Sequence, residues 1–192
     1  MKLKGPLARL FGFSDRDFSL RWTGEVSAPF KPNVMPTQPC YAADVAFEHQ
    51  THVNLCTDAC LNMLFEYRNR SQYKSNLDKN PRSTFSGQST DAVKERIEEA
   101  GLIAFSLRPK GSAKKWTGLE LAENLFLFGP IICMGSGHAI LLIGVSNAET
   151  LIFHDPWRGQ YMPHSLDHFN KKIVNWDNLF SLVAAYPFVK RS

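Results

Sequence analysis

The chain lacks the long hydrophobic runs of membrane proteins. Its longest unbroken apolar stretch, from Ala139 to Val145, is far shorter than the roughly 20 residues that a membrane-spanning helix needs. The N-terminus is basic, but Arg9, Asp15 and Arg16 interrupt its apolar residues, so it does not form the hydrophobic region of a secretory signal. We therefore expect no insertion into a membrane, and any export must use a route that needs no such signal.

Cysteine and concentrated positive charge are also scarce. Four cysteines in 192 residues are too few for a disulfide-stapled scaffold, and they favour a reducing compartment. Lys and Arg number 22 against 18 Asp and Glu, a net charge of +4. The basic residues form scattered pairs without regularly interleaved aromatic residues, so no nucleic-acid partner is expected.

The remaining composition is that of a globular protein. Hydrophobic residues make up 44% and charged residues 21% of the chain, which is enough to bury a core. Residues 1–40 are rich in proline and hold no sustained hydrophobic period. We therefore expect an N-terminal arm or pro-segment over residues 1–40 and one folded domain over residues 41–192.

Hydrophobic periodicity predicts helices first and strands afterwards. Asn54 is the expected N-cap of a helix through residue 69, Thr90 that of a helix through residue 100, and Thr117 forms a capping box with Glu120 for a helix through residue 126. Strands are expected over residues 102–107, 131–134, 138–145, 151–153 and 179–186. This order favours an α+β fold, in which an N-terminal helical part packs on a C-terminal antiparallel sheet.

Cys56 lies in the first turn of the helix expected over residues 54–69. The unpaired amides and the dipole of a helix N-terminus favour negative charge, so a thiol at that place has a lowered pKa and becomes a nucleophile. Cys60, one turn later on the apolar stripe, fits the role of a small buried hydrophobic residue. The same structural role is the alternative for Cys56.

His138 and Asp155 could assist such a thiol. His138 heads the most apolar expected strand, where a polar side chain needs a partner. Asp155 ends the next strand, so its carboxylate could orient the imidazole, while Pro156 keeps it extended and Trp157 covers the pair. The alternatives are a core or strand-end histidine and an ordinary Asp-Pro turn.

Gln50 precedes Cys56 by six residues, across a short segment that leads to the helix. Its side-chain amide, together with the Cys56 backbone amide, could hold the oxyanion that forms when a thiolate attacks a carbonyl.

Metal binding is the competing interpretation of this region. His49, His52, Cys56 and Cys60 are suitable ligand types for a tetrahedral zinc site, but they run into one helix start instead of forming two tight pairs. His164 and His168 are expected on a short exposed helix. We therefore expect no metal.

The combined motifs resemble those of the papain-like cysteine peptidases. They are Gln50 with Cys56, Gly137-His138 before an apolar strand, and the run His154-Asp155-Pro156-Trp157. The chain is most similar to the compact bacterial branches, the bacteriocin-leader (double-glycine) peptidases and the plant-pathogen effector peptidases, over about residues 45–165. Thr57 departs from the plant-type members, which follow the nucleophile with tryptophan.

This resemblance implies a papain-like fold and a role for each matching residue. Cys56 would be the nucleophile, His138 the general base, Asp155 the orienting acid and Gln50 the oxyanion donor. The neighbouring residues Asn54, Gly137 and Trp157 are candidates for the substrate cleft.

The expected activity is cleavage of peptide bonds in a protein or peptide substrate, without a cofactor. The same chemistry would serve an amidase or deamidase acting on Gln or Asn side chains or on peptidoglycan peptides. A third hypothesis is a binding or immunity-type module that does not use the thiol.

The resemblance and the lack of a signal suggest a bacterial effector or toxin. Such a protein would be cytoplasmic in the producing cell and delivered into a target cell without a signal peptide. A secretion apparatus and an immunity protein are then candidate partners.

Overall fold

The computed structural model describes residues 41–52, 54–78, 89–108, 115–135, 137–147, 149–173 and 181–187. The arm expected over residues 1–40 lies outside them and stays a prediction. Among the described residues, no helix has both the length and the apolar character to cross a membrane.

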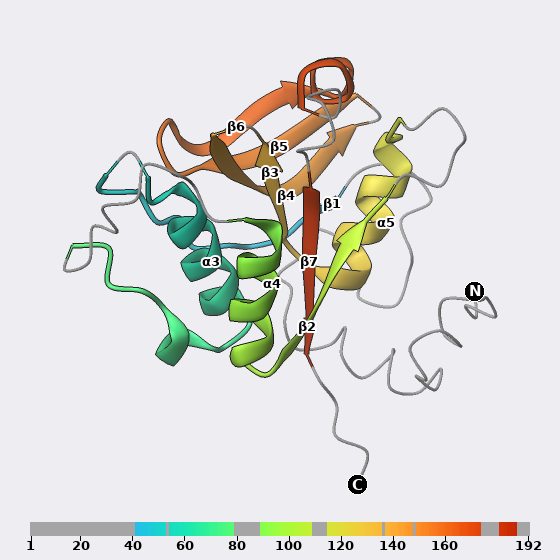
Figure 1. Ribbon diagram of the computed structural model, residues 1–192. Helices are drawn as coiled ribbons and strands as arrows, with labels where there is room; N and C mark the ends of the chain where they lie inside the picture. Colours follow the sequence, from blue (N-terminus) through green and yellow to red (C-terminus); the bar gives the residue numbers. More distant parts are fainter. Residues whose placement is uncertain are drawn as a thin grey trace, which may run out of the picture.

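An antiparallel sheet of seven strands forms the centre of the fold (Figure 1). The strand order is β2-β7-β3-β4-β5-β6, and β1 pairs with β4. The strands are β1 (Tyr41–Ala42), β2 (Leu102–Leu107), β3 (Ile131–Gly135), β4 (His138–Asn147), β5 (Thr150–Asp155), β6 (Gly159–Ser165) and β7 (Ser181–Pro187). Every pairing is antiparallel. The prediction of an α+β fold is confirmed.

Helices pack on this sheet from two sides. Helix α3 (Cys56–Tyr67) contacts β3 and β4, and α4 (Thr90–Glu99) contacts α3, β2 and β7. Helix α5 (Gly118–Phe128) contacts β1, β4 and β7. Figure 1 shows α3 and α4 on one side of the central strands and α5 on the other. Shorter turns of helix are η1 (Ser71–Tyr73), α6 (Leu166–His168) and η2 (Phe169–Ile173).

The sequence signals at the helix ends are partly confirmed. The capping box of Thr117 and Glu120 is present, and Gly129 ends α5 with a φ of 64°. Two predicted caps are wrong. Leu55, without a side-chain cap, occupies the N-cap position expected for Asn54, and Ser89 caps α4 by accepting a hydrogen bond from the Ala92 amide.

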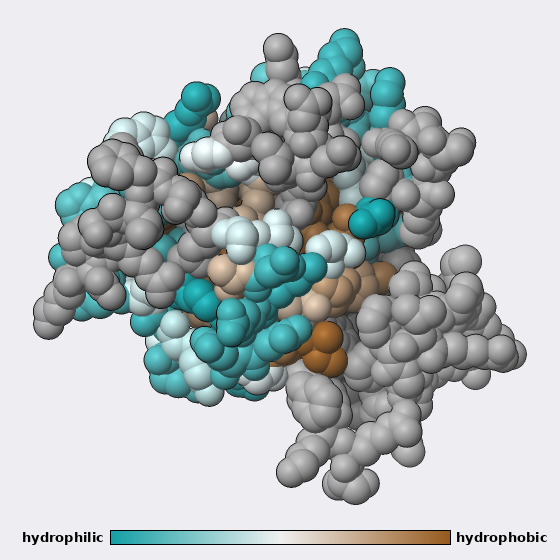
Figure 2. Space-filling model, in the orientation of Figure 1, coloured by the Kyte–Doolittle hydropathy of each residue, from teal (hydrophilic) through white to brown (hydrophobic). Residues whose placement is uncertain are grey.

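The burial of α3 also differs from expectation. The sequence predicts a helix with one apolar stripe, but all residues from Cys56 to Phe65 are buried, including the polar Asn62 at 0% exposure. By contrast, α4 buries Val93 and Ile97 and presents hydrophilic side chains on the surface in Figure 2. Helix α3 is therefore covered by other parts of the chain, including the segment before it and the loop after η1.

Strand β6 is not among the predicted strands. Its residues alternate irregularly between exposed and partly buried positions, and it contains Pro163, which is tolerated at the edge of a sheet. His164, expected on a short helix, lies on this strand, and its ring stacks on that of His168 at 5.7 Å between centroids. The helix begins only after Ser165, whose side chain accepts a hydrogen bond from the His168 amide.

Candidate active site

The sulfur of Cys56 lies at the N-terminal end of α3, beside the start of β4. Cys56 is the first residue of the helix and is 4% exposed. The His138 imidazole, the Ala139 backbone amide and the Thr57 hydroxyl lie near enough to this sulfur to favour its thiolate form. Helix α3 and strand β4 therefore bring together residues 82 positions apart, from 56 to 138.

His138 lies between Cys56 and Asp155. Its Nε2 atom is 2.9 Å from Asp155 Oδ1, and because a carboxylate only accepts, Nε2 donates this hydrogen bond. Nδ1 is then the ring nitrogen that remains for the sulfur. The tight β3–β4 turn presents the imidazole, since Gly135 pairs with His138 and Gly137 adopts a φ of 79°, a conformation that glycine adopts at least cost.

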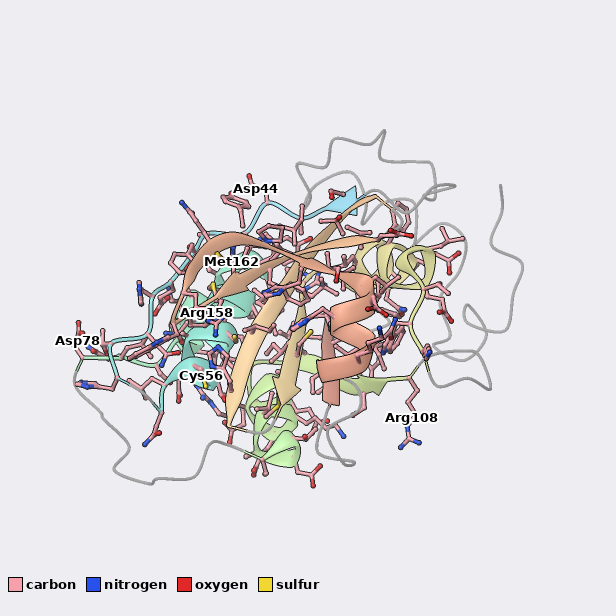
Figure 3. All side chains as sticks on the ribbon, turned by 90° about the horizontal axis from the view of Figure 1, so that it is seen from above. Asp44, Cys56, Asp78, Arg108, Arg158 and Met162 are labelled. Atoms are coloured by element: carbon pink, nitrogen blue, oxygen red, sulfur yellow. The ribbon has the colours of Figure 1, made fainter. Side chains whose placement is uncertain are left out.

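The Asp155 carboxylate is fixed by the turn that follows β5. Besides His138, its Oδ1 accepts hydrogen bonds from the backbone amides of Trp157 at 2.9 Å and Arg158 at 3.2 Å. Burial opposes ionisation of this group, but the hydrogen bond from His138 and those amides lower the pKa of Asp155. Figure 3 views the site from above, with Arg158 and Cys56 labelled. The carboxylate is thus held ionised and oriented toward the imidazole.

The pKa values of the cysteine and histidine shift in opposite directions. Burial alone raises the pKa of the Cys56 thiol, but the hydrogen bond from His138, the Ala139 amide, the charge of His138 and the Thr57 hydroxyl outweigh it and lower this pKa. Hydrogen bonds to Asp155 and Cys56 raise the pKa of His138 to about 9, against the effect of burial. A thiolate–imidazolium pair is therefore favoured near neutral pH.

Gln50 reaches the same region from the segment before α3. It is 5% exposed, and its backbone amide donates to the Pro156 carbonyl at 3.0 Å, which ties it to the turn after Asp155. Its side-chain Nε2 donates to the His52 carbonyl at 2.9 Å, so one of its two N–H groups remains for another acceptor. Within the described part of the chain, its buried Oε1 has no hydrogen-bond partner.

The three cleft candidates differ in their surroundings. Asn54 is partly buried just before the helix, and Gly137 is exposed in the β3–β4 turn. Trp157 holds Asp155 through its backbone amide, while the residue as a whole is 52% exposed. Their expected contact with a substrate, and the covering of the pair by the Trp157 indole, stay predictions.

Sequence reasoning missed two groups that lower the pKa of Cys56, the Ala139 amide and the Thr57 hydroxyl. The Ala139 amide belongs to the backbone and carries no residue-type signal. Thr57 stands out in the sequence only as a departure from the plant-type motif, although a hydroxyl directly after the cysteine could have pointed to this effect on its pKa. His154, the first residue of the motif before Asp155, is fully buried; its Nε2 lies 2.9 Å from the Val45 carbonyl, and its Nδ1 accepts from the Tyr161 amide at 3.2 Å.

The zinc alternative receives no support from this geometry. His49 and His52 are exposed, whereas Cys56 and Cys60 are buried. In the described ranges, no group of three or more His, Cys, Asp or Glu side chains is arranged to hold a metal ion.

The environments of the buried cysteines predict selective alkylation. Burial raises the pKa of Cys60 and of Cys133, whereas that of Cys56 is lowered. Since the thiolate is the reacting form, we expect iodoacetamide at pH 7 to modify Cys56 on the order of 100-fold faster than Cys60. Peptide mass analysis of native and urea-treated protein measures this ratio. Equal native rates at both positions would contradict the thiolate assignment.

Two solved structures with TM-scores above 0.5 share the fold at low sequence identity. A double-glycine-motif protease from an AMS/PCAT transporter, in complex with the leader peptide, is 17% identical with a TM-score of 0.57, covering 77% of this chain and 94% of that one. UfSP from C. elegans is 13% identical with a TM-score of 0.52, covering 83% of this chain and 36% of that one. The peptidase domain of Streptococcus ComA, 15% identical, covers 73% and 97% respectively with a TM-score of 0.46.

A family model gives the more specific relationship. No curated protein matches the chain significantly. The model described as papain-like cysteine protease AvrRpt2, however, matches residues 39–174, which include the segment before α3, helix α3 itself and strands β2 to β6. The chain therefore belongs to the family of the papain-like cysteine protease AvrRpt2 and is a cysteine hydrolase.

Proposed function

We propose that the protein hydrolyses peptide bonds through a triad of Cys56, His138 and Asp155. The observation that carries this proposal is the position of the His138 ring, whose Nε2 lies 2.9 Å from Asp155 Oδ1 and which lies close enough to Cys56 to lower the pKa of its thiol. Covalent acyl transfer requires a nucleophile next to a general base, and a third group that orients the base.

Acylation begins with the thiolate–imidazolium pair. The Cys56 sulfur attacks the carbonyl carbon of the peptide, and the electron pair of the C=O bond moves to the oxygen. The Cys56 backbone N–H, one of the first-turn amides without a helical partner, and the remaining Nε2–H of Gln50 would stabilise this oxyanion. The proton on His138 Nδ1 then passes to the leaving nitrogen, the C–N bond breaks, and a thioester remains.

Deacylation reverses the proton's path. A water molecule gives a proton to His138 Nδ1 while its oxygen adds to the thioester carbonyl. The C–S bond breaks as the second tetrahedral intermediate collapses, which releases the carboxylic acid product and restores the thiolate. Asp155 keeps the imidazole in one orientation throughout and stabilises its positive charge.

The pKa directions set the expected pH dependence. The lowered pKa of Cys56 keeps the thiolate present at neutral pH, whereas the imidazolium that protonates the leaving group is lost as pH rises past the His138 pKa of about 9. Peptidase activity should therefore fall on the alkaline side near that value.

Mass spectrometry tests the reaction itself. Wild-type protein is incubated with mixed protein and peptide substrates and, separately, with muropeptides. Chain cleavage of the proteins or peptides is the expected result. A gain of about 1 Da per side chain without cleavage would replace the peptidase by a deamidase, and cleavage confined to muropeptides would indicate a peptidoglycan amidase. If no product forms that depends on the Cys56 thiol, the binding-module hypothesis remains.

The leader peptide bound by the double-glycine-motif protease supports the choice of a peptide substrate. Delivery as a bacterial effector or toxin, and the secretion and immunity partners that it would require, remain predictions from the sequence.

A further inference from the structure

Asn62 occupies an unusual place in α3. It lies on the same helix as Cys56 and is 0% exposed. Both the NH2 group and the carbonyl oxygen of its side-chain amide are hydrogen-bonded. Its Nδ2 donates to Glu48 Oε1 at 2.7 Å and to the Ser75 carbonyl at 2.9 Å, and its Oδ1 accepts from the Ser75 amide at 2.7 Å. A buried polar network that is fully paired fixes one geometry, because breaking any bond leaves a buried group unsatisfied.

Glu48 belongs to the segment that holds Gln50, so its hydrogen bond with Asn62 connects this segment with α3. Its other carboxylate oxygen pairs with Lys74 Nζ at 2.8 Å, so it links the helix to the loop after η1. The segment 48–52 has two further anchors outside the helix. The Thr51 hydroxyl donates to the Leu77 carbonyl at 2.9 Å, and the Gln50 amide donates to the Pro156 carbonyl.

The same loop is fixed from its other side by an ion pair between the partly buried Arg96 and the buried Asp58. Arg96 on α4 contacts Asp58 Oδ1 at 2.6 Å and donates to the Ser75 hydroxyl at 2.7 Å. The Ser75 hydroxyl also donates to Asp58 at 3.2 Å. Asp58 belongs to the first turn of the nucleophile helix, so the loop cannot shift relative to Cys56 without breaking charged hydrogen bonds.

We propose that Asn62 and Glu48 are positioning residues, which fix the Gln50 amide relative to the Cys56 sulfur. This inference rests on the proposed function, in which Gln50 serves the oxyanion. An oxyanion donor must be held within about 0.5 Å of its productive position, and a displacement of about 1 Å can cost on the order of 100-fold in rate. The Asn62–Glu48 hydrogen bond directly connects the nucleophile helix with the segment that carries Gln50.

Two reagents separate positioning from mere folding. Iodoacetamide requires the thiolate but forms no oxyanion, because substitution occurs at a saturated carbon. With p-nitrophenyl acetate, the sulfur attacks the ester carbonyl through an oxyanion, then p-nitrophenolate leaves and an S-acetyl group remains on Cys56. The ratio of the two rates therefore reports the oxyanion site at constant thiolate content.

The test uses Glu48→Ala in the full chain, since the Glu48 side chain is 26% exposed and its loss is less damaging to folding than that of Asn62. We expect acetylation of Cys56 to fall about tenfold while alkylation stays within twofold. Glu48→Gln, which can still accept from Asn62, should restore most of the acetylation rate. Glu99→Ala, at an exposed position of α4, is the matched control and should change neither rate.

The double variant decides whether Glu48 acts through Gln50. Gln50→Ala alone should lower acetylation about 100-fold, and adding Glu48→Ala to it should lower the rate less than twofold further. The positioning role would be overturned if the losses of acetylation rate in the two single variants multiplied in the double variant. It would also be overturned if Glu48→Ala lost alkylation and acetylation equally, or lost neither. An unchanged acetylation rate in Gln50→Ala, with Cys56→Ala inert, would instead refute the oxyanion role of Gln50 on which the inference rests.

Discussion

Replacing Cys56 with alanine is expected to reduce peptide hydrolysis to background, a loss on the order of 10⁶-fold in kcat. The reason is that no other described side chain at the site can form the covalent intermediate: His138 already pairs with Asp155, and Thr57 lacks a base of its own. Initial rates of cleavage, followed by mass spectrometry of the products, provide the measurement.

Cys60→Ala is the matched control for this loss. Both cysteines lie on α3, one turn apart, but Cys60 is 0% exposed in the core cluster and burial raises its pKa. Its truncation should cost about 1 kcal/mol of stability and leave kcat within about threefold. If Cys56→Ala kept measurable activity, or if both variants lost activity equally, the sulfur of Cys56 would not be the nucleophile.

Replacing His138 with alanine is expected to lower kcat/KM on the order of 10⁴-fold. The variant loses the proton donor for the leaving group and also the hydrogen bond and charge that lower the pKa of Cys56. The pH midpoint of iodoacetamide alkylation should therefore move to higher pH. A rate-against-pH series for both reactions measures the two effects separately.

His168→Ala serves as the comparison, since His168 lies exposed on α6. It should change kcat/KM less than twofold. A His138→Ala variant whose alkylation midpoint stayed at the wild-type pH would show that the imidazole does not stabilise the thiolate, and the ion-pair mechanism would fail.

Local signals in the sequence predicted much of the secondary structure. The strand over residues 102–107 has the predicted bounds, and the capping box of Thr117 with Glu120 opens α5 as expected. These features depend on residues near one another in the chain, where hydrogen bonding and hydrophobic period act directly. The order of Cys56, His138 and Asp155, and the family resemblance that it carries, likewise follow from the amino-acid sequence alone.

The wrong predictions come from places where distant residues decide. The sequence places Asn62 away from the apolar stripe of its helix because its type is polar, yet Glu48 and Ser75 pair its amide and permit complete burial. Strand β6 has no clear alternation of apolar and polar residues, and it is its pairing with β5 that makes it a strand. Asn54 is a good N-cap by type, but Leu55 occupies that position.

The sequence by itself determined the chemical inventory: a cysteine at the start of a helix, a histidine at the head of an apolar strand and an acid at the end of the next. Tertiary structure decided which nitrogen of His138 contacts Asp155, how the amides of Ala139, Trp157 and Arg158 surround the charged groups, and how Asn62 pairs with Glu48 in the segment before the helix. The physical reason is that pKa values and hydrogen-bond geometry depend on distances between segments, and those distances exist only once the helix, the loop and the sheet have packed together.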